Sequence, residues 1–172
     1  MMKLKWMAVS VLGLAIVTGC GGGTSSTGPT AQTFTASLTG AKERPTPNSS
    51  TGTGTATFTL SADENTLTWN ITLTNTNNVT ASHIHVGGTE IAGPIVLPLY
   101  AAAKSNNPAI SGTITRATFA SPLGISWDAL ISLMRSGDAY ANVHTDDGVA
   151  PTNTGPGDFP GGEIRGQITL SP

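Results

Sequence analysis

The chain has 172 residues and a formal net charge of −2, with 10% charged and 38% hydrophobic side chains. This length is typical of one globular domain with a short extension. Phosphate binding needs clustered cations, and the eight Lys and Arg residues are scattered, so the composition argues against a nucleic-acid partner.

An export signal is predicted over residues 1–19. Lys3 and Lys5 precede a stretch at 6–17 that is apolar except for Ser10, which is the arrangement of a signal peptide. The stretch is well short of the roughly 20 residues that a spanning helix needs, so a retained transmembrane anchor is the weaker interpretation. Loss of this leader would leave six cationic and ten acidic side chains, a net charge near −4.

Cys20, the only cysteine, is predicted to carry a lipid. The tetrad 17–20 resembles the lipobox of bacterial lipoproteins, which implies a membrane anchor and a location in the cell envelope. Because Gly21 and not Asp follows the cysteine, we expect the periplasmic side of the outer membrane or the cell surface. The alternative is an ordinary secreted protein with a stray cysteine in its leader. A single cysteine leaves no internal disulfide and no thiolate metal site in the mature chain.

Residues 20–31 are predicted to be the lipidated cysteine and a flexible linker rich in Gly, Ser and Thr. Residues 32–172 then form one domain of short alternating segments punctuated by Gly and Pro. We expect an all-β, antiparallel, Greek-key-like sandwich or barrel of about seven to eight strands, built from two packed sheets. The strand candidates are 33–39, 53–60, 66–73, 79–86, 94–99, 110–115, 140–145 and 164–170.

One short helix is predicted at about residues 126–136. Ser126 can cap its N-terminus, Asp128 suits the positive end of the helix dipole, and Gly137 can end it. The apolar side chains at helical spacing are interpreted as core packing.

The three histidines are the candidate metal ligands. His83 and His85 share one face of the 79–86 strand, because side chains at i and i+2 point the same way. His144 lies on the polar face of the 140–145 strand, and Glu163 precedes the last strand. If these strands are neighbours, three imidazoles could converge, with Glu163 as a fourth ligand or as the acceptor that orients an imidazole. Nitrogen donors without sulfur suit copper, with zinc as the alternative. The competing interpretation is that His83 and His85 are solvated strand residues.

Three ordered motifs resemble the CHRD domain, which is named from repeats in chordin. They lie at residues 81–87, 140–145 and 161–167, and the opening segment 34–45 is similar too. The resemblance spans about residues 32–170 and implies an exported β-sandwich domain whose biochemical role is poorly defined. Histidines in two of the motifs favour the metal hypothesis.

A weaker likeness links the chain to the copper, zinc superoxide dismutases, whose copper site begins with a His-x-His strand and gains another histidine from a late strand. The matching residues are His83, His85 and His144. No histidine remains for a bridging ligand, and no zinc-binding loop or cysteine pair is visible. Superoxide dismutase activity is therefore not expected. Asp146 and Asp147 beside His144 could suggest acid–base chemistry, but acidic residues before a glycine are common turn formers. The sequence shows no Gly-x-Ser-x-Gly elbow and no phosphate loop, so catalysis is the weakest interpretation.

Two functions remain open. The first is a cell-envelope protein that binds copper or zinc; the second is a lipid-tethered adhesion or interaction module without a metal. Either is compatible with a homo-oligomer or an envelope protein partner. The segment 149–160 lacks periodicity and is interpreted as a mobile surface loop in preference to a cover for the histidine face.

Overall fold

A computed structural model of the chain describes residues 28–172. The predicted leader at 1–19, Cys20 and most of the predicted linker lie outside the described residues. Within 28–172, no helix is both long enough and apolar enough to cross a membrane.

Strands dominate the described part of the chain, as the alternating pattern predicts. The elements are β1 (Gln32–Thr39), a 3₁₀ turn η1 (Gly40–Lys42), β2 (Thr53–Leu60), β3 (Thr66–Thr74), β4 (Val79–Val86), β5 (Ile95–Ser105), β6 (Ile110–Thr115), α1 (Trp127–Ser136), β7 (Ala139–Thr145), β8 (Ile164–Gln167) and β9 (Thr169–Leu170).

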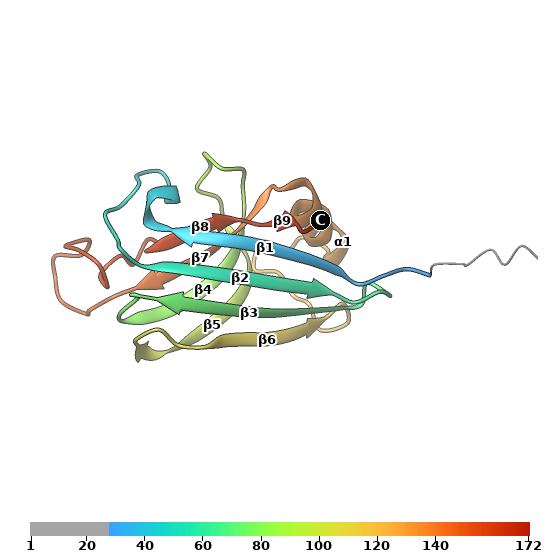
Figure 1. Cartoon of the computed structure of the whole chain (residues 1–172), viewed down its shortest axis with the longest axis horizontal. Coiled ribbons are helices and arrows are strands. Elements are labelled where there is room, and N and C mark those ends of the chain that lie inside the picture. The colour runs from blue at the N-terminus through green and yellow to red at the C-terminus, as the bar shows by residue number, and fades with distance from the viewer. Residues whose placement is uncertain (1–27) are drawn as a thin grey trace, which may run out of the picture.

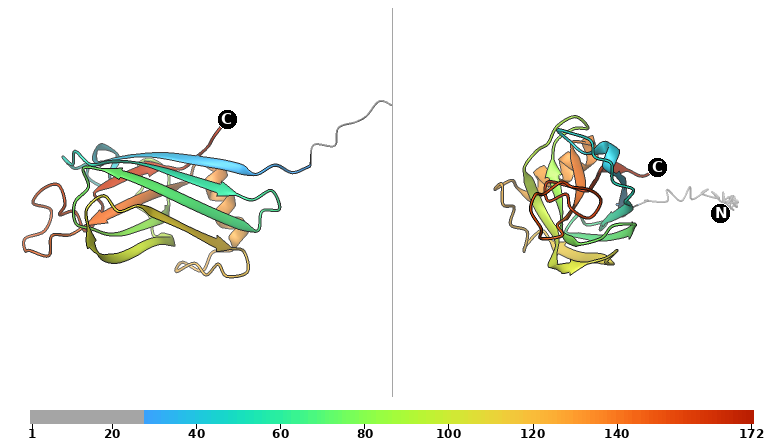
Figure 2. Two further views of the ribbon diagram at one scale, coloured as in Figure 1. Left: turned by 60° about the horizontal axis from the view of Figure 1, so that its bottom comes forward. Right: turned by 90° about the vertical axis from the view of Figure 1, so that its left-hand side faces the viewer.

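The strands form one antiparallel sheet that curls into a nearly closed barrel (Figures 1 and 2). Their order is β5-β4-β7-β8-β1-β2-β3-β6, and β9 pairs with β1. β5 and β6, at the two ends of this order, approach each other. Strands β4, β5 and β6 follow one another and β7 returns to pair with β4, which is a Greek-key connection. The prediction of an all-β fold is confirmed, and the form is one rolled sheet and not two separate sheets.

The inner face of the barrel is apolar. β1 contributes Phe34, Ala36 and Leu38, and the register places Phe34 opposite Phe58, which in turn lies opposite Trp69. Burying each large side chain of this kind stabilises the fold by about 1.5–3 kcal/mol.

The predicted helix is present and closes one end of the barrel. The Ser126 hydroxyl accepts a hydrogen bond from the Ala129 amide, and Gly137 ends the helix in the left-handed region at φ 77°. The apolar face of α1 joins the core with the side chains Trp127, Leu130, Ile131 and Met134.

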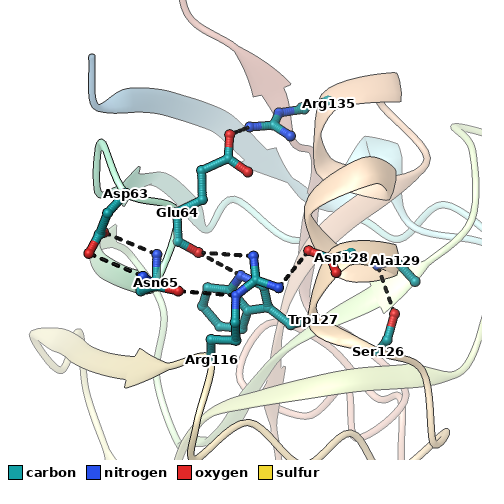
Figure 3. Close-up of polar contacts among 9 residues, drawn as sticks. All are labelled: Asp63, Glu64, Asn65, Arg116, Ser126, Trp127, Asp128, Ala129 and Arg135. Atoms are coloured by element: carbon teal, nitrogen blue, oxygen red, sulfur yellow. Dashed lines mark hydrogen bonds and ion pairs between the residues drawn. The ribbon is translucent and has the colours of Figure 1, made fainter. Parts of the chain in front are cut away.

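Polar contacts connect α1 to the β2–β3 turn (Figure 3). The indole N–H of Trp127 donates to the Glu64 carbonyl at 2.8 Å, Arg135 pairs with the Glu64 carboxylate at 2.5 Å, and Arg116 pairs with Asp128 at 2.7 Å. Exposed ion pairs of this kind contribute at most about 1 kcal/mol each. In Figure 1 this end of the barrel lies opposite the long connection between β7 and β8.

Candidate metal centre

The three histidines lie together on the outward face of the sheet. β4 and β7 are hydrogen-bonded neighbours, with Ala81 opposite His144 and His83 opposite Asn142. One ring nitrogen from each of His83, His85 and His144 lies within 4.8 Å of the others. His83 Nδ1 is 3.0 Å from His144 Nε2. The strand adjacency that the sequence left open is therefore present, and the cluster could hold a metal ion.

Backbone carbonyls orient two of the imidazoles. His85 Nδ1 lies 2.9 Å from the Gly93 carbonyl oxygen, and His144 Nδ1 lies 3.0 Å from that of Pro160. A carbonyl oxygen only accepts, so each Nδ1 carries the proton and each Nε2 keeps a lone pair. His85 Nε2 is buried and has no hydrogen-bond partner. A buried lone pair without a donor is what a metal ligand leaves when its ion is removed.

A second group of contacts holds the His85 ring. Tyr140 stacks on it at 4.9 Å between ring centroids and 12° between planes. The Tyr140 hydroxyl accepts from the Gly93 amide at 3.0 Å and donates to the Gly93 carbonyl at 3.2 Å. The Arg165 guanidinium lies 3.5 Å from the Tyr140 ring centroid and donates to the carbonyls of Gly88 and Ile91, both at 2.8 Å. Arg165 and Tyr140 thus fix the β4–β5 connection that carries the Gly93 carbonyl.

Burial keeps the imidazoles neutral. Desolvation lowers the pKa of His83 to about 4, and repulsion from His144 and His85 adds to the effect. The pKa values of His85 and His144 are lowered as well, again chiefly by burial. Because the neutral imidazole is the form that binds metals, His85 and His144 each present an Nε2 lone pair at neutral pH. In the metal-free protein His144 Nε2 accepts from the Nδ1–H of His83, so His83 must adopt its other tautomer, with the proton on Nε2, to bind a metal through Nδ1.

Glu163 lies outside the histidine group. Its fully buried carboxylate accepts hydrogen bonds from the Ser50 hydroxyl, the Thr145 hydroxyl and the Gly157 amide. The β7–β8 ladder begins at Ile164, so Glu163 precedes the regular alternation on which its predicted orientation depends. The contacts show it joining three chain segments, and they include no imidazole.

The 149–160 segment begins as an exposed loop, in keeping with the prediction of a surface loop, but its last residues pack against the barrel and contact one histidine. Val149 is exposed, but Gly157, Asp158 and Phe159 are buried, and Pro160 supplies the carbonyl that orients His144. The chain doubles back here because Phe159 pairs with Thr145, at the end of β7.

Glu43 and Asn142 are buried polar residues beside this face that the sequence pattern did not single out as site residues. The Asn142 amide donates to Glu43 Oε2 at 3.3 Å, while Glu43 Oε1 and Asn142 Oδ1 have no partner. Burial raises the pKa of Glu43 to about 7. Glu43 also lines a cavity of about 520 Å³ between the segments 43–49 and 153–162. In the sequence it appeared only within the opening CHRD-like motif.

The fold and the site define an all-β barrel domain with a three-histidine cluster on its outward face. The family model of the CHRD domain matches residues 34–168, a range that includes all three histidines and most of the chain. The chain belongs to the CHRD domain family, as its motifs predicted. Among curated proteins, no sequence matches it.

Proposed function

We propose that this protein is a copper-binding lipoprotein of the cell envelope, with His83, His85 and His144 as the copper ligands. The observation that carries the proposal is the convergence of three neutral imidazoles around the buried, unpartnered Nε2 of His85. Three nitrogen donors without sulfur favour copper, because Cu²⁺ binds such sites more tightly than the other first-row divalent ions. Zinc is the alternative, since it accepts the same donors.

The ring orientations indicate which atoms would hold the ion: His83 Nδ1, His85 Nε2 and His144 Nε2. Two nitrogens bound at 2.0 Å to a tetrahedral ion lie about 3.3 Å apart. The 3.0 Å between His83 Nδ1 and His144 Nε2 is close to that spacing. Three protein ligands leave a position for water or for a ligand that exchanges the metal, so we propose storage or delivery of copper as the role.

Titration of the purified protein with Cu(II) against a competing chelator tests this proposal. We expect one tight site, and a loss of at least about 100-fold in affinity for each of His83→Ala, His85→Ala and His144→Ala, because each removes a donor. The control is Asn70→Ala on the exposed face of β3, which should bind as the parent does. Affinities unchanged by all three histidine substitutions would instead favour the metal-free interaction module.

The lipid anchor is a separate part of the proposal, supported by the lipobox-like tetrad that ends at Cys20. In a bacterial host, the parent should fractionate with membranes and incorporate labelled fatty acid. Cys20→Ser should incorporate none. Equal labelling of the two proteins would contradict lipidation at this position.

A further inference from the structure

Three aspartates gather at the far end of β7, just beyond His144, and differ from the histidines in chemistry. Asp146 and Asp147 follow the strand directly, and Asp158 returns to them at the end of the long connection. One carboxylate oxygen from each lies within 4.8 Å of the others. The Asp146 amide donates to the Asn78 carbonyl at 3.1 Å, and the Asp158 amide donates to the Gly155 carbonyl at 3.1 Å. The backbone therefore holds both sides of the cluster.

Asp158 carries an unsatisfied buried oxygen. The residue is only 2% exposed, and its Oδ2 accepts from the Thr154 amide at 2.9 Å and the Thr154 hydroxyl at 2.8 Å. Its Oδ1 is buried and has no partner. An anionic oxygen in that position is strongly destabilising unless a donor or a cation reaches it.

Within residues 28–172, no cationic side chain forms an ion pair with these three carboxylates. The ion pairs there join Arg44 to Glu90, Arg116 to Asp128 and Arg135 to Glu64. The nearby Lys104 ammonium donates at 2.6 Å to the main-chain carbonyl of Asp147. Three carboxylates thus face one another without a paired cation.

We infer that Asp146, Asp147 and Asp158 bind a calcium ion. The donors are all oxygen, which suits a hard cation and does not suit copper. Ca²⁺ accepts irregular arrangements of oxygens at about 2.3–2.6 Å, whereas Mg²⁺ demands near-ideal octahedral geometry at about 2.0–2.1 Å. All three carboxylate oxygens lie within 4.8 Å of one another, a spacing that one bound Ca²⁺ can span. The ion would fasten the loop between Asp147 and Asp158, two residues before the Pro160 carbonyl that orients His144.

Calcium binding to the chelator-treated protein tests this inference, by calorimetric titration with CaCl₂ and by thermal unfolding. We expect one site with a dissociation constant on the order of 10⁻⁴–10⁻³ M, as in extracellular calcium modules. At 5 mM CaCl₂ the melting temperature should rise by at least about 3 °C, because the ion binds only the folded chain. Equal concentrations of MgCl₂ should produce a smaller rise.

Two variants locate the site. Asp158→Asn keeps an acceptor for Thr154, and Asp147→Asn keeps the acceptor for its only side-chain hydrogen bond, from the Val149 amide. Each should lose the calcium-dependent shift, while Asp63→Asn on the exposed β2–β3 turn should keep it. His144→Ala should also keep it, which separates this site from the proposed copper site. The inference is overturned if the parent shows no calcium-dependent heat or shift, or if both aspartate variants respond as the parent does.

Discussion

The two sides of the barrel differ in how far their outward side chains are exposed to solvent. On β2 and β3 the outward side chains, such as Thr57, Asn70 and Thr72, are half-buried or exposed. On β7 and β8 the corresponding side chains Asn142 and Arg165 are buried, and so is Tyr140. The difference arises because connections between strands lie over β4, β7 and β8. The polar residues of the candidate site lie on this covered side, formed by β4, β7 and β8.

Polar contacts attach the covering connections to the side formed by β4, β7 and β8. The Asn48 amide donates to the carbonyls of Gly162 and Glu163, and Gln167 donates to the carbonyl of Gly87. Each of these partly buried hydrogen bonds stabilises the fold by about 1 kcal/mol, but leaving a buried partner unpaired costs about 1–3 kcal/mol. Substitutions on the two sides should therefore differ sharply in their effects.

The largest contrast is expected between Arg165→Met and Asn70→Ala. Met keeps the apolar stem of Arg165 but leaves the Gly88 and Ile91 carbonyls without donors, so the free energy of unfolding should fall by about 3–5 kcal/mol. Asn70→Ala on the solvated side should change it by less than about 0.5 kcal/mol. Urea unfolding of both variants measures the difference. Similar values for the two would remove the distinction between the faces.

Arg165→Met should also weaken copper binding, because it releases the connection whose Gly93 carbonyl orients His85. The affinity should drop by about 10- to 100-fold, as is typical when the partner of a ligating histidine is lost. An unchanged affinity at a temperature where the variant is folded would show that His85 is held without Arg165.

Glu43→Gln should stabilise the protein at alkaline pH. The carboxyl has an ordinary pKa of 4.5 and one of about 7 when buried in the folded chain, because burial disfavours its charge. The folded state therefore binds more protons between these values, and the contribution of Glu43 to stability is lost as pH rises from about 4.5 to about 7. Glu43→Gln has no carboxyl to ionise and avoids this loss. At pH 8 its free energy of unfolding should therefore exceed that of the parent by about 2–3 kcal/mol, whereas at pH 4 the two values should be similar. Denaturant unfolding at both pH values checks the difference, and a constant offset would contradict it.

The pKa shift of His83 should give stability the opposite dependence on pH. Its pKa falls from 6.5 to about 4 on folding, so the unfolded chain binds more protons between these values. In the metal-free protein, stability should therefore fall as pH decreases from about 6.5 to about 4, by about 2 kcal/mol after allowance for the partial exposure of the ring. Comparison with His83→Gln isolates this effect from that of Glu43. A difference between parent and variant that stays constant across the window would contradict the burial of the imidazole.

The smallest effect is expected at the helix, at the other end of the barrel. Ser126→Ala removes the hydroxyl that accepts from the Ala129 amide and should cost about 1 kcal/mol. Its copper affinity should equal that of the parent, since the hydrogen bonds described for His83, His85 and His144 include none from α1. Thermal unfolding and copper titration of the same sample measure both quantities. A changed copper affinity would mean that the two ends are coupled.

The solvated side of the barrel was predictable because its alternation is clear. The predicted ranges 53–60 and 66–73 match β2 and β3 to within one residue. The predicted strand 94–99 extends to Ser105 as β5, through the exposed residues Ala101, Ala102, Ala103 and Lys104, whose types seldom mark a strand. The predicted strand 164–170 is divided: β8 lies between β7 and β1 and pairs with both, whereas β9 pairs with β1.

The candidate site was predictable only in part. The shared face of His83 and His85 follows from strand geometry, whereas the adjacency of β4 and β7 depends on long-range topology that local pattern does not encode. The Gly93 and Pro160 carbonyls, which orient His85 and His144, are backbone groups and leave no mark in side-chain periodicity. The burial of the outward side chains of β7 and β8 was not predicted either, because the segments that cover them are irregular and have no periodic pattern.

Paramagnetic resonance of the Cu(II)-loaded protein can show whether β4 and β7 share one copper ion, because pulsed methods count the imidazoles bound to it. We expect a single one-to-one species with three imidazole nitrogens, and the loss of that species in both His83→Ala and His144→Ala. Weak binding that neither substitution alters, or a mixture of species with one imidazole each, would contradict a copper site shared by β4 and β7.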